Sequence, residues 1–109
     1  MRSEYQIDCD SQPDIAVLSG VFRLATPEQY DAAFAPLTDR MGKAPAYTVD
    51  LTNVVLMNSS GLRALADLVL AARRAGTPLT FLGKADVPWH NKTVASLKPL
   101  YQGLAVRLS

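Results

Sequence analysis

The sequence is poor in the residues on which disulfides, metal sites and most acid–base catalysis depend. Its 109 residues include one cysteine, Cys9, and one histidine, His90. A single cysteine cannot form an internal disulfide, so we expect a reducing compartment and read Cys9 as a small buried residue. No Cys/His cluster has the spacing of metal ligands. We therefore predict neither a metal ion nor a cofactor.

The chain also lacks a large excess of charge and a long apolar run. The net charge is +1 and the pI is near 7.9, whereas nucleic-acid binding usually shows a strongly basic face. Arg73 and Arg74 are adjacent, but late in a predicted helix, where the dipole favours cations. No apolar run approaches the ~20 residues of a membrane span, and Met1–Tyr5 does not resemble a signal peptide. We expect a soluble cytoplasmic protein without direct nucleic-acid binding or membrane insertion.

Catalytic motifs are equally scarce. Ser59 with His90 is a conceivable nucleophile and base, but no G-x-S-x-G elbow surrounds Ser59. His90 follows Trp89 at the start of a predicted helix, where capping or packing is the commoner role. The glycines are too dispersed for a phosphate-binding loop or a dinucleotide fingerprint. The sequence therefore favours a protein that is not an enzyme.

Residues 1–109 fit one domain, with an expected radius of gyration of about 13 Å. Alternating apolar and polar residues predict strands over 5–9 and 47–51. Short, mostly apolar segments predict strands over 15–24, 79–82 and 104–108, with a bend or bulge at Ser19-Gly20. A break at Thr52-Asn53 separates the third strand from the apolar run Val54–Met57. With three intervening helices, the order β-β-α-β-α-β-α-β predicts an α/β fold. Its sheet would be mixed, mostly parallel and about five strands wide, with helices packed beside it.

Three helices are expected. Thr26 is a good N-cap with Pro27 at the first helical position, and Pro36 should kink or shorten that helix. The second covers Arg63–Arg74 and ends at Gly76. A short third helix carries Val94 and Leu97 and stops near Pro99. The apolar stripe of the second helix is wide enough to indicate either deep burial or a docking face, and it consists of Leu62, Leu65, Ala66, Leu68, Val69, Leu70 and Ala72.

The most informative stretch is Val54–Leu62. Four apolar residues, read as the end of a buried strand, run into Asn58-Ser59-Ser60-Gly61, and a helical pattern begins at once. On physical grounds this is a helix cap in which Asn58 or Ser59 accepts from a backbone N–H, worth ~1 kcal/mol. Gly61 would let the turn pack tightly. The two hydroxyls lie where a helix presents unpaired N–H groups.

The stretch also resembles a known family. Asp50–Leu62, which reads D-L-T-N-V-V-L-M-N-S-S-G-L, is similar to the signature of STAS domains, in which D-L-S/T precedes an apolar run and D-S/T-S-G-L opens a helix. Leu18–Leu24 stands where the family has L-x-G-x-L-D-L. Ala75–Gly83 fits its passage from helix to strand. The resemblance covers nearly the whole chain and implies a STAS-like (SpoIIAA-like) fold.

The resemblance implies a switch protein. Stand-alone STAS domains act as anti-sigma-factor antagonists, each controlled by an anti-sigma factor that is also a serine/threonine kinase and by a cognate phosphatase. Carried over by position, Ser59 is the phosphoacceptor. Asn58, Ser60, Gly61, Leu62 and Arg63 complete the partner-binding corner. The resemblance also allows a homodimer.

Two departures and two alternatives accompany this interpretation. The family usually has an acid where this chain has Asn58, and Lys84–His90 differs from the common pattern. Trp89 and His90 would either pack the third helix against the sheet or form a partner-specific surface. In the first alternative the chain is an unphosphorylated STAS subunit of a lipid-transport ABC complex, or a signalling scaffold. In the second it is a small hydrolase that uses Ser59 and His90.

Overall fold

The computed structural model describes residues 4–109 as a five-stranded sheet with helical segments between its strands. The elements in chain order are β1 (Tyr5–Asp8), β2 (Ile15–Phe22), α1 (Pro27–Lys43), β3 (Tyr47–Met57), α2 (Ser59–Ala75), β4 (Leu79–Gly83), η1 (His90–Val94), η2 (Ala95–Leu100) and β5 (Leu104–Leu108). The strands lie side by side in chain order, and β1 runs antiparallel to β2 while every other pair is parallel. The predicted mixed, mostly parallel sheet is confirmed.

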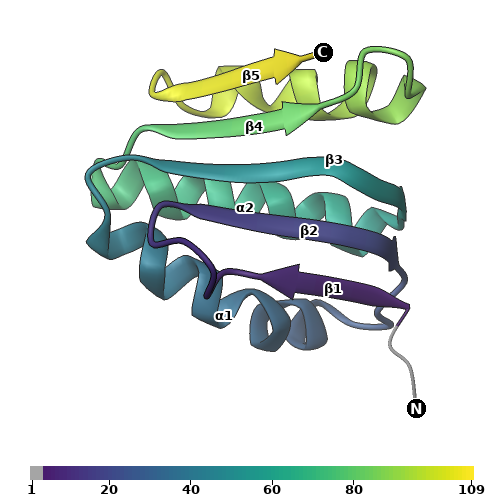
Figure 1. Ribbon diagram of the computed structural model, residues 1–109, viewed down its shortest axis with the longest axis horizontal. Helices are drawn as coiled ribbons and strands as arrows, with labels where there is room; N and C mark the ends of the chain where they lie inside the picture. The colour runs from purple at the N-terminus through teal and green to yellow at the C-terminus, as the bar shows by residue number, and fades with distance from the viewer. Residues whose placement is uncertain (1–3) are drawn as a thin grey trace.

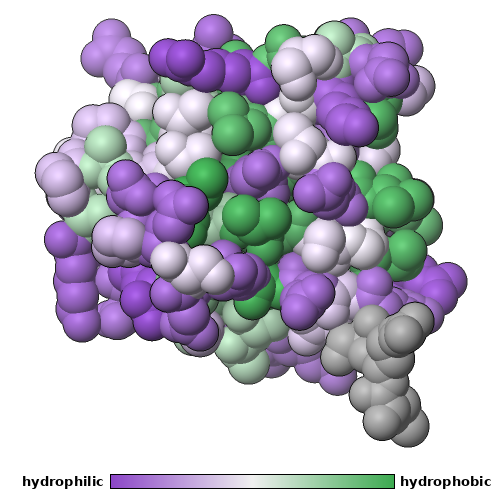
Figure 2. Space-filling view, viewed as in Figure 1, coloured by the Kyte–Doolittle hydropathy of each residue, from purple (hydrophilic) through white to green (hydrophobic). Residues whose placement is uncertain are grey.

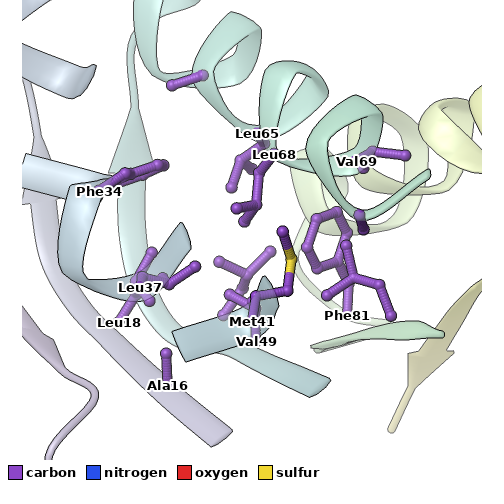
Figure 3. Packing of buried hydrophobic residues seen from close by; sticks show 14 of the residues in the cluster. Ala16, Leu18, Phe34, Leu37, Met41, Val49, Leu65, Leu68, Val69 and Phe81 are labelled. Atoms are coloured by element: carbon purple, nitrogen blue, oxygen red, sulfur yellow. The ribbon is translucent and has the colours of Figure 1, made fainter. Parts of the chain in front are cut away.

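The helices cover one face of the sheet and leave the other open (Figure 1). The alternation within the strands follows from this arrangement, because successive side chains point to opposite faces. In β4, for example, Leu79 and Phe81 are buried while Thr80 and Leu82 are half-buried. Figure 3 shows part of the resulting core, which includes Leu65 and Leu68 of α2, Phe34 and Met41 of α1, and Phe81 of β4.

α1 begins and α2 ends at the predicted signals. The Thr26 hydroxyl accepts from the Gln29 N–H at 3.2 Å, and Pro27 opens α1. Gly76, with φ of +71°, closes α2 in the left-handed conformation that glycine adopts readily. Pro36 does not shorten α1, which continues to Lys43. Pro36 lies on the exposed side of α1, where water can reach the carbonyl that its missing N–H leaves unpaired.

The wide apolar stripe of α2 is explained by burial. Leu65, Leu68 and Val69 are buried, and Leu62 and Leu70 are half-buried. Within residues 4–109, the exposed large hydrophobic side chains are Val55 and Leu56, and neither belongs to α2. The width of the stripe is accounted for by packing against the sheet, α1 and η2.

The expected break at Thr52-Asn53 is wrong, because β3 is continuous from Tyr47 to Met57. The register between β2 and β3 shifts by one residue at each of two bulges, where β3 has one extra residue. These bulges let β3 pass through the polar pair Thr52-Asn53 without a break. The paired residues are Val17 with Asp50, Ser19 with Asn53, Gly20 with Val54 and Val21 with Leu56. A bulge bends a strand without ending it, and the predicted irregularity at Ser19-Gly20 is confirmed, with Gly20 at φ +93°.

The third helix also differs from expectation. It is a π-helical turn, η1, followed by a 3₁₀ segment, η2, which continues through Pro99 to Leu100. Val94 is buried as predicted, while Leu97 and Leu100 are partly buried against the core. Proline is tolerated near the end of so short a segment because few intrahelical bonds depend on its missing N–H.

Candidate functional site

The candidate site is the corner between β3 and α2, which we define as residues 54–63. Its central side chain is Asn58, the N-cap of α2. The Asn58 Oδ1 atom accepts from the Gly61 N–H at 3.0 Å and from the Tyr30 hydroxyl at 2.7 Å. The Asn58 Nδ2 group donates to the Leu24 carbonyl at 2.9 Å. The capping role predicted for Asn58 is confirmed, and the same side chain also ties α2 to α1 and to the segment after β2.

This network explains why an amide, and not an acid, fits at position 58. An ionised carboxylate only accepts hydrogen bonds, so it could not serve the Leu24 carbonyl as Nδ2 does. Burial raises the pKa of the Tyr30 hydroxyl, which therefore remains a donor to Asn58 at neutral pH. The asparagine is thus matched to one acceptor and two donors around it.

Gly61 is required by close packing under the corner. A Cβ atom at this position would lie 2.8 Å from the Tyr30 hydroxyl oxygen and would also collide with the Met57 side chain. The glycine thereby lets the first turn of α2 rest on the Tyr30 ring. The tight packing expected of Gly61 is confirmed, and its cause is a residue of α1 that the local sequence does not reveal.

The two serines differ in exposure. Ser59 is the first residue of α2 and its side chain is exposed, whereas Ser60 is half-buried. The first turn of α2 contains no acidic residue. Arg63, four positions after Ser59, is also exposed, and residues with this spacing are neighbours on a helix surface. A modifying enzyme could therefore reach the Ser59 hydroxyl, and an added anion there would meet a helix N-terminus and a nearby guanidinium.

The apolar run before the corner is only half buried, which corrects the interpretation of Val54–Met57 as a buried strand end. Val54 and Met57 are 2% and 6% exposed, while Val55 and Leu56 are 69% and 49% exposed. The second bulge places these two consecutive side chains outside the core. Figure 2, which views the open face of the sheet, shows apolar surface near the end where β2 and β3 finish. A hollow of about 350 Å³ adjoins Val55 and reaches Lys84.

His90 and Trp89 hold η1 against the exposed end of β3. The Lys84 N–H donates to His90 Nδ1 at 3.0 Å, so Nδ1 carries no proton, and the protonated Nε2 donates to the Val54 carbonyl at 3.1 Å. The Trp89 indole N–H donates to the Val55 carbonyl at 3.2 Å. Burial lowers the pKa of His90. The packing role predicted for both residues is confirmed.

The geometry offers little for catalysis. Both ring nitrogens of His90 are engaged by backbone groups, so His90 is not available as a base for Ser59. Between residues 4 and 109, no three His, Cys, Asp or Glu side chains gather as metal ligands would, and Cys9 is a buried free thiol, as expected. In the same range, no helix is long and apolar enough to cross a membrane.

Three features of the corner were not predicted from the sequence. They are the hydrogen bond from Tyr30, the hydrogen bond to Leu24, and the exposure of Val55 and Leu56. Tyr30 and Leu24 are distant in sequence from Asn58, and no pattern in either segment marks them as its partners. Val55 and Leu56 were hidden within a uniform apolar run. A signal for the exposed pair does exist, because a strand that buries one face cannot bury four consecutive residues.

The comparisons with known proteins bear on the fold. No family model and no curated protein matches the chain. Among solved structures, the chain is similar to the crystal structure of diguanylate cyclase SiaD in complex with its activator SiaC from Pseudomonas aeruginosa. The fold is the SpoIIAA-like α/β fold. The matched chain is the activator, with a TM-score of 0.65 and 17% identity over 100% of this chain and 95% of that chain. At this identity the likeness concerns the fold alone.

Proposed function

We propose that this chain is a regulatory protein whose corner docks onto another protein, and that reversible phosphorylation of Ser59 controls the docking. One observation carries the proposal: an exposed serine opens α2 beside the two exposed large hydrophobics Val55 and Leu56. A protein of the same fold, SiaC, is the activator of a diguanylate cyclase, and so acts on a partner protein. Engagement of both His90 nitrogens supports a function other than catalysis.

A phosphate on Ser59 would act on the docking surface and leave the helix intact. It adds about −1.5 to −2 charges. At the first residue of α2 this charge faces the positive end of the helix dipole, with no acid in the first turn to repel it. Arg63 is placed four residues on, where it can pair with the phosphate. The modification would therefore alter the charge and bulk of the surface formed by Val55, Leu56 and the corner.

The STAS resemblance supports a particular partner. In this proposal the unphosphorylated chain binds an anti-sigma factor that is also a serine/threonine kinase, and thereby acts as an anti-sigma-factor antagonist. The kinase modifies Ser59 and a cognate phosphatase restores it. Asn58, Ser60, Gly61, Leu62 and Arg63 belong to the same corner. Their roles differ: Asn58 and Gly61 hold the turn, and the exposed Arg63 is free to contact the partner.

Affinity purification from the native cell, followed by intact-mass measurement, tests the partner and the phosphate together. We expect a kinase-type anti-sigma factor to co-purify with the unmodified chain. A second fraction should carry the mass of one phosphate, and fragmentation should place it on Ser59. A phosphate mapped to Ser60 alone, or none under any growth condition, would reject the switch.

Substitutions at the two serines separate charge from folding. Ser59→Asp should keep the circular dichroism of the wild type and weaken binding to the purified partner. Ser59→Ala should bind as well as the wild type and accept no phosphate. Ser60→Ala should leave phosphorylation at Ser59 unchanged, and Ser96→Ala, at an exposed serine of η2 outside the corner, is the matched control for binding. Loss of helix in Ser59→Asp, or unchanged binding, would contradict the mechanism.

A second candidate is a constitutive subunit of a lipid-transport ABC complex or a signalling scaffold. The observation that favours it is the exposed pair Val55 and Leu56, whose apolar contact needs no phosphate. This candidate predicts stable co-purification with an ATPase or membrane complex and an unmodified Ser59. The double variant Val55→Ser/Leu56→Ser should abolish that association and leave the fold intact. The intact-mass experiment decides between the two candidates.

A further inference from the structure

A groove between α1 and α2 lies apart from the exposed pair and from Ser59. It encloses about 470 Å³ and is lined by side chains of both helices. Its floor is formed by the edges of the buried residues Phe34 and Leu68. Its walls include Ala35 and Ala71, whose small side chains leave the space between the helices unfilled.

The rim of the groove carries an uneven charge. Asp31 and Asp67 both line it and are exposed, and the ion pairs found in residues 4–109 include neither of them. Asp39 also lines it, but Lys43 lies 3.2 Å away and offsets its charge. Arg74 lines the groove seven residues after Asp67, which is about 10 Å along the helix axis. The groove therefore has an acidic part and a separate basic position.

This local acidity differs from the charge of the whole chain, which is +1. A net charge of +1 does not attract a cationic partner to the protein as a whole. Such a partner is attracted only where carboxylates lie close together. The small alanine side chains between α1 and α2 also leave room for a third helix to pack against both. Helices pack with axes 8–10 Å apart, depending on the side chains at the contact. An amphipathic helix in an apolar groove is a recurring mode of protein recognition.

We propose that this groove binds an amphipathic α-helix of a partner protein. Its apolar side chains would rest on the floor at Phe34 and Leu68. A lysine or arginine of the helix would face Asp31 and Asp67, and a carboxylate about two turns away would face Arg74. The groove meets the corner at Tyr30, but none of residues 54–63 lines it, so the inference does not rest on the function proposed for Ser59.

Synthetic peptides provide the test. The probe is a 14-residue helical peptide with leucines at i, i+3, i+4 spacing and lysines on the flanks, and its control carries glutamates in place of the lysines. We expect the lysine peptide to bind in titration calorimetry and to shift backbone NMR signals of Asp31, Ala35, Asp67 and Ala71. The glutamate peptide should bind at least about tenfold more weakly, because each exposed pair changes from attraction to repulsion.

Matched variants of the full chain locate the site. Asp31→Asn/Asp67→Asn should weaken the lysine peptide about fivefold to tenfold, whereas the equal charge change Asp14→Asn/Asp86→Asn, away from the groove, should leave affinity unchanged. The inference is overturned if neither peptide binds, if both bind equally, or if the shifted signals lie outside the groove. Equal weakening by the two double variants would also overturn it.

A steric pair of variants is independent of charge. Ala35→Leu fills the groove from the exposed side of α1, and Ala32→Leu adds the same volume at an exposed position of α1 that does not line the groove. We expect Ala35→Leu to abolish peptide binding and Ala32→Leu to preserve it, with both variants retaining the wild-type circular dichroism. Binding that survives in Ala35→Leu would count against the groove.

Discussion

At the scale of single residues, Asn58 is the side chain on which the corner depends. It satisfies the N-terminus of α2 through Gly61, and it bonds to Tyr30 and to the Leu24 carbonyl. These partners come from three separate segments of the chain. Because the amide both donates and accepts, neither an acid nor a hydrophobic residue can replace it without leaving a polar group unpaired.

We expect Asn58→Asp to destabilise the protein at neutral pH by about 1–3 kcal/mol, because the Leu24 carbonyl loses its donor and faces a carboxylate. Urea unfolding at pH 7 measures the change. Asn53→Asp, at an exposed position of β3, is the matched control and should change stability by less than about 0.5 kcal/mol. The deficit of Asn58→Asp should shrink in acid, where a protonated carboxyl can donate again. Equal stability of the two variants at pH 7 would show that the Leu24 contact is unimportant.

Gly61 gives a second prediction at this scale. Gly61→Ala should cost about 1–3 kcal/mol, because the new methyl group collides with Met57 and Tyr30. Gly42→Ala is the control: it lies within α1, nothing lies within 4 Å of an added Cβ, and alanine should stabilise the helix by up to about 1 kcal/mol. Thermal unfolding should therefore separate the two variants in opposite directions.

At the scale of elements, η1 acts as a brace for the end of β3. β4 pairs with β3 only along Tyr47–Asp50, so the later part of β3 has no strand on that side. The side chains of Trp89 and His90 bond to the carbonyls of Val55 and Val54 there. The brace keeps backbone groups satisfied and holds the exposed pair beside α2.

The His90 contacts predict a pH dependence. Burial lowers the pKa of His90 below the ordinary value of 6.5 in the folded state. The stability contributed by neutral His90 is therefore present above about pH 6.5 and is lost as the pH falls further, because the unfolded chain takes up the proton first. Urea midpoints at about pH 7.5 and about pH 5.5 should show this loss.

His90→Gln is the control for that measurement. It keeps a donor for the Val54 carbonyl but cannot titrate, so its stability should fall less between the two pH values. At the higher pH it should be less stable than the wild type by about 1–3 kcal/mol, because the Lys84 N–H loses its acceptor. Identical pH dependence in both proteins would mean that His90 does not control the change.

At the scale of the whole molecule, the sheet with helices on one face makes one continuous core. The radius of gyration is 12.7 Å, close to the expected value for a chain of this length. The core joins buried residues from β2, β3, β4 and β5 and from α1, α2 and η1, and the partly buried Tyr5 and Ile7 of β1 pack against it. The other face of the sheet carries no helix and shows apolar and polar side chains intermixed (Figure 2).

A single core predicts cooperative unfolding of the whole chain. Far-ultraviolet circular dichroism reports mainly on the helices, and the fluorescence of Trp89, the only tryptophan, reports on η1. We expect the two urea transitions to coincide. A fluorescence transition at lower urea would show that η1 detaches before the core unfolds and that the brace is a separate cooperative unit.

The sequence by itself determined the features that depend on local patterns. Period-two alternation and short apolar runs marked the strands, Thr26-Pro27 and Gly76 marked helix ends, and Asn58–Gly61 marked the start of α2, because propensities and caps act within a few residues. Only the tertiary structure decided which residues of the corner face outward and what Asn58 bonds to. The pairing of β2 with β3 creates the bulges that expose Val55 and Leu56, and the docking of α1 brings Tyr30 against Gly61. Both depend on segments that are distant in sequence, so no local pattern of the corner contains them.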